Sequence, residues 1–188
     1  VGVAGRDAQG HSLARRFAGL LEFIDLHRAR FKEIVVVALV DHDGRTGAAT
    51  LLAQARQAGM VTCVDLVSSQ SEAYQKTVFG TLPEIDWLFL NEVEAARATG
   101  VDISGETDRD NMAQAAAQLL QGGVRKGCIL HTPQVTLWIT PEQTLWFDVP
   151  QIPKSEIISA VGAGDAFAAG VLHGIHEGWS PQKCVQLG

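Results

Sequence analysis

The chain has 188 residues, of which 46% are hydrophobic and 19% charged, and its formal net charge is −6. This size and composition predict one soluble globular domain that covers residues 1–188. The negative charge gives no support to nucleic-acid binding, and no apolar run approaches the ~20 residues that a membrane helix needs. Residues 1–10 are small and polar, unlike a signal peptide, and the three cysteines are far apart. We therefore expect free thiols and a cytoplasmic protein.

The first half of the chain alternates between strand and helix patterns. Short runs rich in β-branched residues are typical of strands buried on both faces, and they alternate with longer segments that have helical periodicity. Strands are predicted over 34–40, 61–66 and 86–90, and helices over 11–30, 45–58, 71–79 and 92–99. Short connections between such elements indicate a parallel sheet with helices on both faces.

The second half adds shorter strands and three more helices. Strands are predicted over 128–130, 136–139 and 144–147, with a hairpin around Pro141, and helices over 108–121, from the turn at Gly162 to about His176, and from Ser180 onward. The expected fold class is a three-layer α/β fold with a mostly parallel sheet. A ligand is expected outside the carboxyl ends of its parallel strands.

The sharpest local feature is a glycine turn that opens directly into an alanine-rich helix, Gly162-Ala163-Gly164-Asp165. Glycine lets the backbone turn tightly, and the first amides of a helix have no partner within it, so this turn predicts a phosphate site. Asp165 is a favourable first-turn residue for the helix dipole. Beside a phosphate, however, a carboxylate repels the ligand, and a useful role there is to take the proton of an attacking hydroxyl.

The turn and its helix resemble the D-T-x-G-A-G-D-x-F-x-x-G signature of the ribokinase-like (PfkB-type) carbohydrate kinases. Gly162, Ala163, Gly164, Asp165, Phe167 and Gly170 match the signature position for position. The resemblance implies that Gly162, Ala163 and Gly164 form an anion hole and that Asp165 is the general base. It also implies ATP and Mg²⁺ as cofactors and a small-molecule sugar as substrate, with no nucleic-acid or membrane partner, and it leaves room for a homodimer.

A second match lies at Asn91-Glu-Val-Glu94, which resembles the N-x-x-E motif of the same family. By themselves, Asn91 is a good helix cap and Glu94 a favourable first-turn residue. The resemblance implies that both help to bind the nucleotide and that Glu94 orders Mg²⁺, directly or through a water. The surrounding block, residues 86–100, resembles fructokinase-like members of the family.

Several positions depart from the family pattern or leave alternatives open. Ser159-Ala160 replaces the leading Asp-Thr, so monovalent-cation activation is in doubt. His131 begins a stretch without glycine where the family has a nucleotide-contacting loop. Its side chain is expected either to contact phosphate or, more simply, to face solvent. Asp65 is expected either to face the phosphates or to serve a structural turn.

The resemblance covers about residues 32–188, and the chain looks truncated at both ends relative to the family. The missing amino-terminal part would carry most sugar contacts and the lid. Two functions are therefore open: a sugar kinase, or a non-catalytic nucleotide-binding remnant of one.

Overall fold

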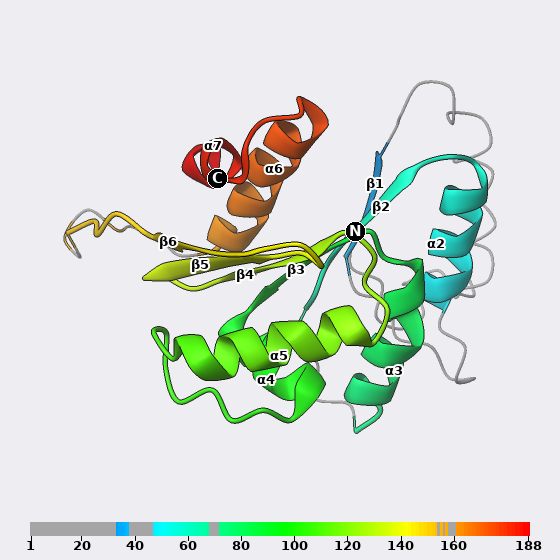
Figure 1. Ribbon diagram of the computed structural model, residues 1–188, viewed down its shortest axis with the longest axis horizontal. Helices are drawn as coiled ribbons and strands as arrows, with labels where there is room; N and C mark the ends of the chain where they lie inside the picture. Colours follow the sequence, from blue (N-terminus) through cyan, green and yellow to red (C-terminus); the bar gives the residue numbers. More distant parts are fainter. Residues whose placement is uncertain (1–32, 38–46, 68–71, 154, 156, 158–160) are drawn as a thin grey trace, which may run out of the picture.

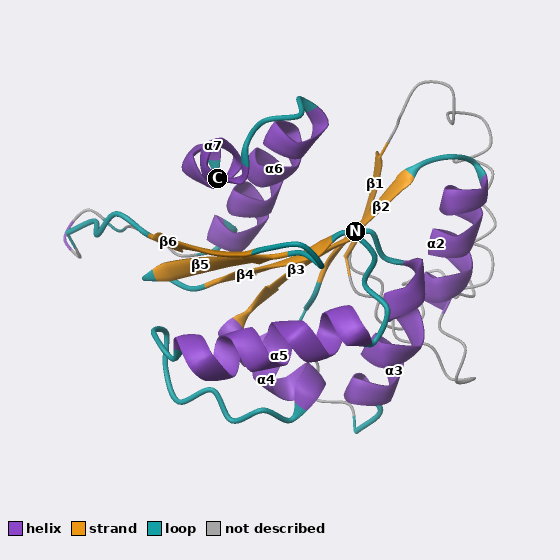
Figure 2. Cartoon of the chain, viewed as in Figure 1, coloured by secondary structure: helices purple, strands orange, loops and turns teal. Residues whose placement is uncertain are grey.

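The computed structural model describes residues 33–37, 47–67, 72–153, 155, 157 and 161–188. Within these residues, one sheet has six strands in the order β1-β2-β3-β4-β5-β6 (Figures 1 and 2). The strands are β1 Glu33–Val37, β2 Val61–Asp65, β3 Trp87–Asn91, β4 Gly127–His131, β5 Val135–Ile139 and β6 Thr144–Asp148. The pairings from β1 to β4 are parallel, whereas β5 and β6 continue the sheet as antiparallel hairpins.

Helices cover both faces of this sheet. In Figure 1, α4 and α5 lie below the sheet, and α6 and α7 lie above it. The helices are α2 Gly47–Gln57, α3 Tyr74–Thr81, α4 Glu92–Thr99, α5 Arg109–Gln121, α6 Ala163–His176 and α7 Pro181–Leu187, with a short 3₁₀ turn over Leu82–Glu84. None of the helices in the described ranges is both long and apolar enough to cross a bilayer.

Each face of the sheet has its own apolar cluster. The larger cluster joins α2, α3, α4 and α5 to one face through residues such as Leu51, Leu88 and Leu119. The smaller one joins α6 and α7 to the other face through Phe89 and Ile129. Because side chains alternate along a strand, neighbouring strand residues supply the two clusters in turn. The expected three-layer α/β class is confirmed, and the predicted elements within the described residues are present, with ends that agree or differ by at most three residues.

The whole predicted helix over 11–30 and residues 38–40 of the first predicted strand lie outside the described residues.

Local signals explain most of the helix ends that are described. Gly59 and Gly100 follow α2 and α4 with φ of +81° and +78°, the left-handed conformation in which glycine carries no Cβ penalty. Ser180 caps α7 by accepting a hydrogen bond from the amide of Lys183, and Pro181 occupies the first helical position.

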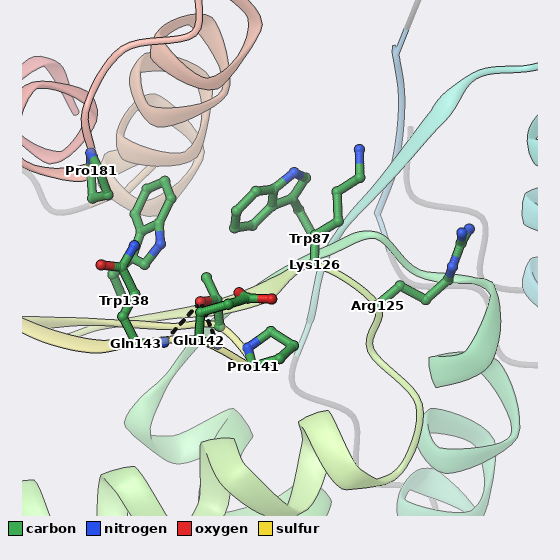
Figure 3. A pocket seen from close by; sticks show the side chains of 9 residues that line it. Trp87, Arg125, Lys126, Trp138, Pro141, Glu142, Gln143 and Pro181 are labelled. Carbon is green, nitrogen blue, oxygen red and sulfur yellow. Dashed lines mark hydrogen bonds between the residues drawn. The ribbon is translucent and has the colours of Figure 1, made fainter.

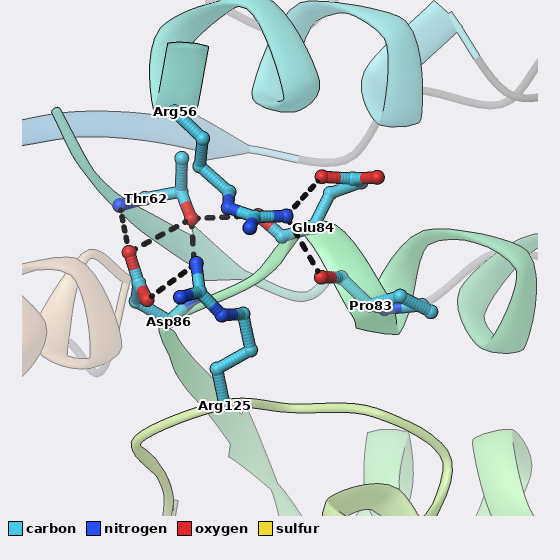
Figure 4. A network of polar contacts seen from close by, with 6 residues as sticks. All are labelled: Arg56, Thr62, Pro83, Glu84, Asp86 and Arg125. Carbon is cyan, nitrogen blue, oxygen red and sulfur yellow. Dashed lines mark hydrogen bonds and ion pairs between the residues drawn. The ribbon is translucent and has the colours of Figure 1, made fainter. Parts of the chain in front are cut away.

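A buried carboxylate joins the amino ends of β2 and β3 (Figure 4). Asp86 accepts hydrogen bonds from the amide of Thr62 at 2.9 Å and from its hydroxyl, while its other oxygen lies 3.3 Å from the guanidinium of Arg125. A buried charge needs such partners to be tolerated. The network fixes the ends of the strands that lie opposite the candidate site.

Candidate active site

Three neighbouring parallel strands end in polar residues: Asp65 on β2, Asn91 on β3 and His131 on β4. Asn91 pairs in register with His131, and Asp65 pairs with Phe89. Phe89 and Ile129 belong to the apolar cluster beneath α6. Because residues two apart share a face, the three polar side chains lie on the α6 side of the sheet, at the carboxyl ends of its strands.

The glycine turn lies at the amino terminus of α6, as expected. Gly162 caps the helix with φ of +81°, a conformation that favours glycine. The amide of Ala166 is the first to bond back, to the carbonyl of Gly162, so the amides of residues 163–165 have no helical partner. Asp165 is exposed in this first turn. The turn therefore offers amide donors for an anion next to an accessible carboxylate.

Asn91 and Glu94 form a reciprocal capping box at the start of α4. The side-chain oxygen of Asn91 accepts from the amide of Glu94 at 2.8 Å, and the carboxylate of Glu94 accepts from the amide of Asn91 at 2.9 Å. Glu94 is only 7% exposed. Asn91 and Glu94 therefore both cap α4. The same hydrogen bonds hold the Glu94 carboxylate in a fixed position at the end of β3.

Asp65 connects the two motifs electrostatically. The pKa of its carboxyl is raised to about 7, first by burial and then by the negative charges of Glu94 and Asp165. Residues 65, 94 and 165 are thus brought together, although they are far apart in the sequence. The sequence left Asp65 undecided between a turn and the ligand side. Its position at a strand end was the available signal, and the structure places it with the other two carboxylates.

His131 does not face solvent, so the simpler of its two expectations is wrong. It is the last residue of β4, and its ring is half-buried with its centroid 5.0 Å from that of Phe167. A Cβ placed on Gly164 would lie 3.4 Å from its Cε1 and 3.8 Å from its Nε2. Burial lowers the pKa of the imidazole to about 4. Ser159 and Ala160, which bear on the cation site, lie outside the described residues.

A cavity of about 320 Å³ lies at the opposite end of the sheet (Figure 3). Trp87 and Lys126 line it at the starts of β3 and β4, together with Trp138 and the turn after β5. A five-residue strand spans about 13 Å, so this hollow is well separated from Asn91 and His131 at the other strand ends. It is not where the sequence motifs converge.

Within the described ranges, no three or more His, Cys, Asp or Glu side chains are grouped closely enough to hold a metal ion by themselves. The three cysteines, Cys63, Cys128 and Cys184, are buried thiols. A cation at the carboxylates of residues 65, 94 and 165 would therefore need further ligands from water or from a bound phosphate.

Comparison with known proteins identifies a family for the chain. The family model for pfkB family carbohydrate kinases matches residues 23–188. Adenosine kinase 1 of Arabidopsis thaliana is 30% identical over 113 residues, which cover 57% of this chain and 32% of that protein. Cytidine kinase of Thermococcus kodakarensis is 29% identical over 136 residues, which cover 71% of this chain and 46% of that protein.

The fold is shared with solved kinases. The structure of Arabidopsis thaliana ribokinase complexed with ribose and ATP superposes with a TM-score of 0.68 at 19% identity, and it covers 88% of this chain and 49% of that one. The chain thus spans half or less of the length of these relatives. Since the family model matches most of the chain and the motif residues lie together at one end of its sheet, this protein belongs to the pfkB family of carbohydrate kinases.

Proposed function

We propose that the protein transfers the γ-phosphoryl group of ATP to a hydroxyl group of a sugar, with Asp165 as general base and Gly162, Ala163 and Gly164 as anion hole. The observation that carries this proposal is the exposed Asp165 carboxylate in the first turn of α6, beside amides that have no helical partner. The similarity to kinases of adenosine and cytidine, and to a ribokinase complexed with ribose and ATP, supports it.

The proposed step is an in-line displacement at phosphorus. The acceptor hydroxyl attacks the γ-phosphorus as its proton passes to the carboxylate of Asp165, and the bond to the β–γ bridging oxygen breaks, releasing ADP. The amides of residues 163–165 and the positive end of the α6 dipole stabilise the charge on the transferring group. A base that starts as a free carboxylate suits this role, because it accepts one proton and needs no prior activation.

The carboxylates suit Mg²⁺ that is held partly by phosphate oxygens. Magnesium prefers oxygen ligands and keeps several waters. It would offset the repulsion from Glu94 and Asp165, which adds to burial in raising the pKa of Asp65. We assign Glu94 to this metal shell, directly or through a water, with Asn91 fixing its position. The metal, when bound, would offset the negative charge of the phosphates.

The acceptor is proposed only as a sugar, and the fructokinase-like subtype stays a proposal within that class. The relatives that the chain matches are named for adenosine, cytidine and ribose. Their names do not single out fructose.

The test is Asp165→Asn in the complete gene product. The change keeps the size of the side chain and removes its basicity, so kcat should fall by about 10²–10⁴ while nucleotide affinity stays nearly constant. Steady-state kinetics with ATP, Mg²⁺ and a panel of sugars, together with calorimetric titration of ADP, measure both quantities.

The matched control is Asp110→Asn, because Asp110 is also an exposed acidic residue in the first turn of a helix, α5. It should leave kcat unchanged. If Asp165→Asn turned over like the wild type, Asp165 would serve only the helix dipole. If the wild type bound nucleotide but turned over no acceptor, the non-catalytic alternative would hold.

A further inference from the structure

The cavity of about 320 Å³ at the starts of β3 and β4 has no part in the proposed phosphoryl transfer. Its volume is within the range of small-molecule sites. The rings of Trp87 and Trp138 line it, with centroids 5.2 Å apart in an edge-to-face arrangement. Pro141 in the turn after β5 and Pro181 at the start of α7 complete its apolar lining (Figure 3). The sheet and α7 thus both contribute to its walls.

This apolar lining suits a flat ring. Trp87 is only partly buried, so part of its indole is open to the cavity. Aromatic rings bury large areas, and they pack well on one another when offset or edge to face. A planar aromatic group therefore fits beside Trp87 better than a flexible aliphatic chain does.

The polar groups of the cavity are mostly hydrogen-bond donors. Arg125, Lys126 and the indole N–H of Trp138 can only donate. Trp138 is 4% exposed, and its Nε1 has no hydrogen-bond partner among the described residues. The hydroxyl of Thr140 accepts from two backbone amides of the turn, which leaves its proton to donate. Such a set of donors calls for a ligand rich in acceptors.

The charges favour an anion over a cation. Indole faces attract cations, but two cationic side chains line this cavity against one acidic residue, Glu142. The guanidinium of Arg125 lies 3.3 Å from Asp86 and keeps further N–H donors. Lys126 is exposed and forms no ion pair within the part of the chain that the structure describes. Its ammonium is therefore available to a ligand.

We propose that this cavity binds a small aromatic anion, with its ring against Trp87 and its carboxylate or phosphate beside Arg125 and Lys126. The inference is independent of the proposed function. The cavity lies at the strand ends opposite Asn91 and His131, so it can be filled while a nucleotide occupies the other edge of the sheet.

The first test adds 2-naphthoate to the complete gene product and follows the indole N–H signals by two-dimensional ¹H–¹⁵N NMR. Each signal is assigned by a Trp→Phe variant. The signals of Trp87 and Trp138 should move, whereas those of Trp146 and Trp179, which do not line the cavity, should stay. The uncharged analogue 2-naphthamide should bind at least about 10-fold more weakly, because it cannot pair with the cations. Equal binding of the two probes would overturn the inference.

The second test changes the charge of the lining in both directions. Lys126→Gln should weaken 2-naphthoate binding by about 3- to 10-fold, and Glu142→Gln should strengthen it by about 2- to 5-fold. The matched control is Lys76→Gln, because Lys76 is an exposed lysine on α3 outside the cavity. Both of the changed residues are exposed, so the variants should fold normally. Binding that is unchanged in both variants, or that changes in the same direction, would contradict the proposed role of charge.

A third arm with AMP separates the two kinds of anion. If AMP moves the indole signal of Trp138 at lower concentration than 2-naphthoate does, the cavity takes an aromatic phosphate. If 2-naphthoate acts at the lower concentration, the cavity takes an aromatic carboxylate. If neither probe moves the signals of Trp87 and Trp138, the inference is wrong, while the proposed role of Asp165 is unaffected.

Discussion

At the scale of single residues, the candidate site concentrates negative charge. The negative charges of Glu94 and Asp165 both act on the carboxyl of Asp65, in addition to its burial. The pKa of Tyr74 rises to about 12, first through burial and then through the charge of Glu94. Carboxylates held this close to one another are unfavourable without a cation. The arrangement is understandable if a cation and a phosphate chain are part of the working site.

Changing Glu94 to Gln should raise the Mg²⁺ concentration needed for half-maximal rate, because it removes the charge that orders the metal shell. Glutamine can still accept the hydrogen bond from the amide of Asn91, so the capping box survives. Titration of the rate with Mg²⁺ measures the effect, and Glu92→Gln in the same first turn is the control. An unchanged Mg²⁺ dependence would leave Asn91 and Glu94 with a capping role only.

The depressed pKa of His131 makes stability depend on pH. The folded protein binds fewer protons at this ring than the unfolded chain does between pH 6.5 and about 4, so stability is fully present above pH 6.5 and falls as the pH drops through this window. Between pH 7.5 and pH 5 the expected loss is ~2 kcal/mol. This prediction is checked by urea unfolding of the wild type and of His131→Phe, both without nucleotide. Between pH 7.5 and pH 5, the free energy of unfolding of the variant should fall by ~2 kcal/mol less than that of the wild type.

At the scale of elements, the orientation of α6 decides where Asp165 stands. This helix is rich in alanine and glycine, and it packs closely on α7. A Cβ on Gly174 would lie 2.7 Å from the sulfur of Cys184 and 2.9 Å from its Cα, and one on Gly170 would lie 2.7 Å from the Cα of Gly188. Small residues on α6 are therefore needed for close contact with α7 as well as for the glycine turn.

Changing Gly174 to Ala should lower stability by about 1–3 kcal/mol, because the clash with α7 outweighs the gain in helix propensity. Gly80→Ala is the matched control: Gly80 also lies in a helix, α3, but a Cβ there meets nothing within 4 Å. The control should be neutral or stabilising by up to ~1 kcal/mol. Thermal unfolding measures the melting temperatures of both variants. Equal melting temperatures would contradict the close packing of α6 on α7.

At the scale of the whole molecule, the two ends of the sheet carry different groups of polar residues. The motif residues gather at the carboxyl ends of β2, β3 and β4, while the starts of β2 and β3 carry the Asp86 network. Parallel strands feed their carboxyl ends into loops and helix starts at the same edge, which is where ligands of such folds bind. The chain contains this edge of the sheet, with the motif residues, but it spans half or less of the length of the relatives compared.

We predict that the 188-residue chain alone turns over no sugar at a useful rate, although the complete gene product does. Phosphoryl transfer needs donor and acceptor held in line, and such positioning is worth ~7–11 kcal/mol of barrier. A coupled assay of the purified chain with ATP, Mg²⁺ and candidate sugars tests this. Saturable turnover by the chain alone would show that the acceptor site lies within these residues.

The sequence determined most of the secondary structure and both motifs. Alternating β-branched and helical patterns located the strands and helices, and Asn91 caps a helix as expected, within a reciprocal capping box that the structure adds. The glycine turn at Gly162 was also foreseeable, because a left-handed residue before a helix favours glycine. These features depend on residues within a few positions of each other, so local sequence is sufficient to predict them.

Only the tertiary structure decided which of these residues lie close to one another. The pairing of Asn91 with His131, and the closeness of Asp65 to Glu94 and Asp165, join segments separated by tens of residues. Whether a strand residue faces α6 or the opposite helices depends on the phase of the strand, and a shift by one residue reverses it. The burial and the lowered pKa of His131 follow from that phase and from the packing of α6, and neither can be read from the residues around it.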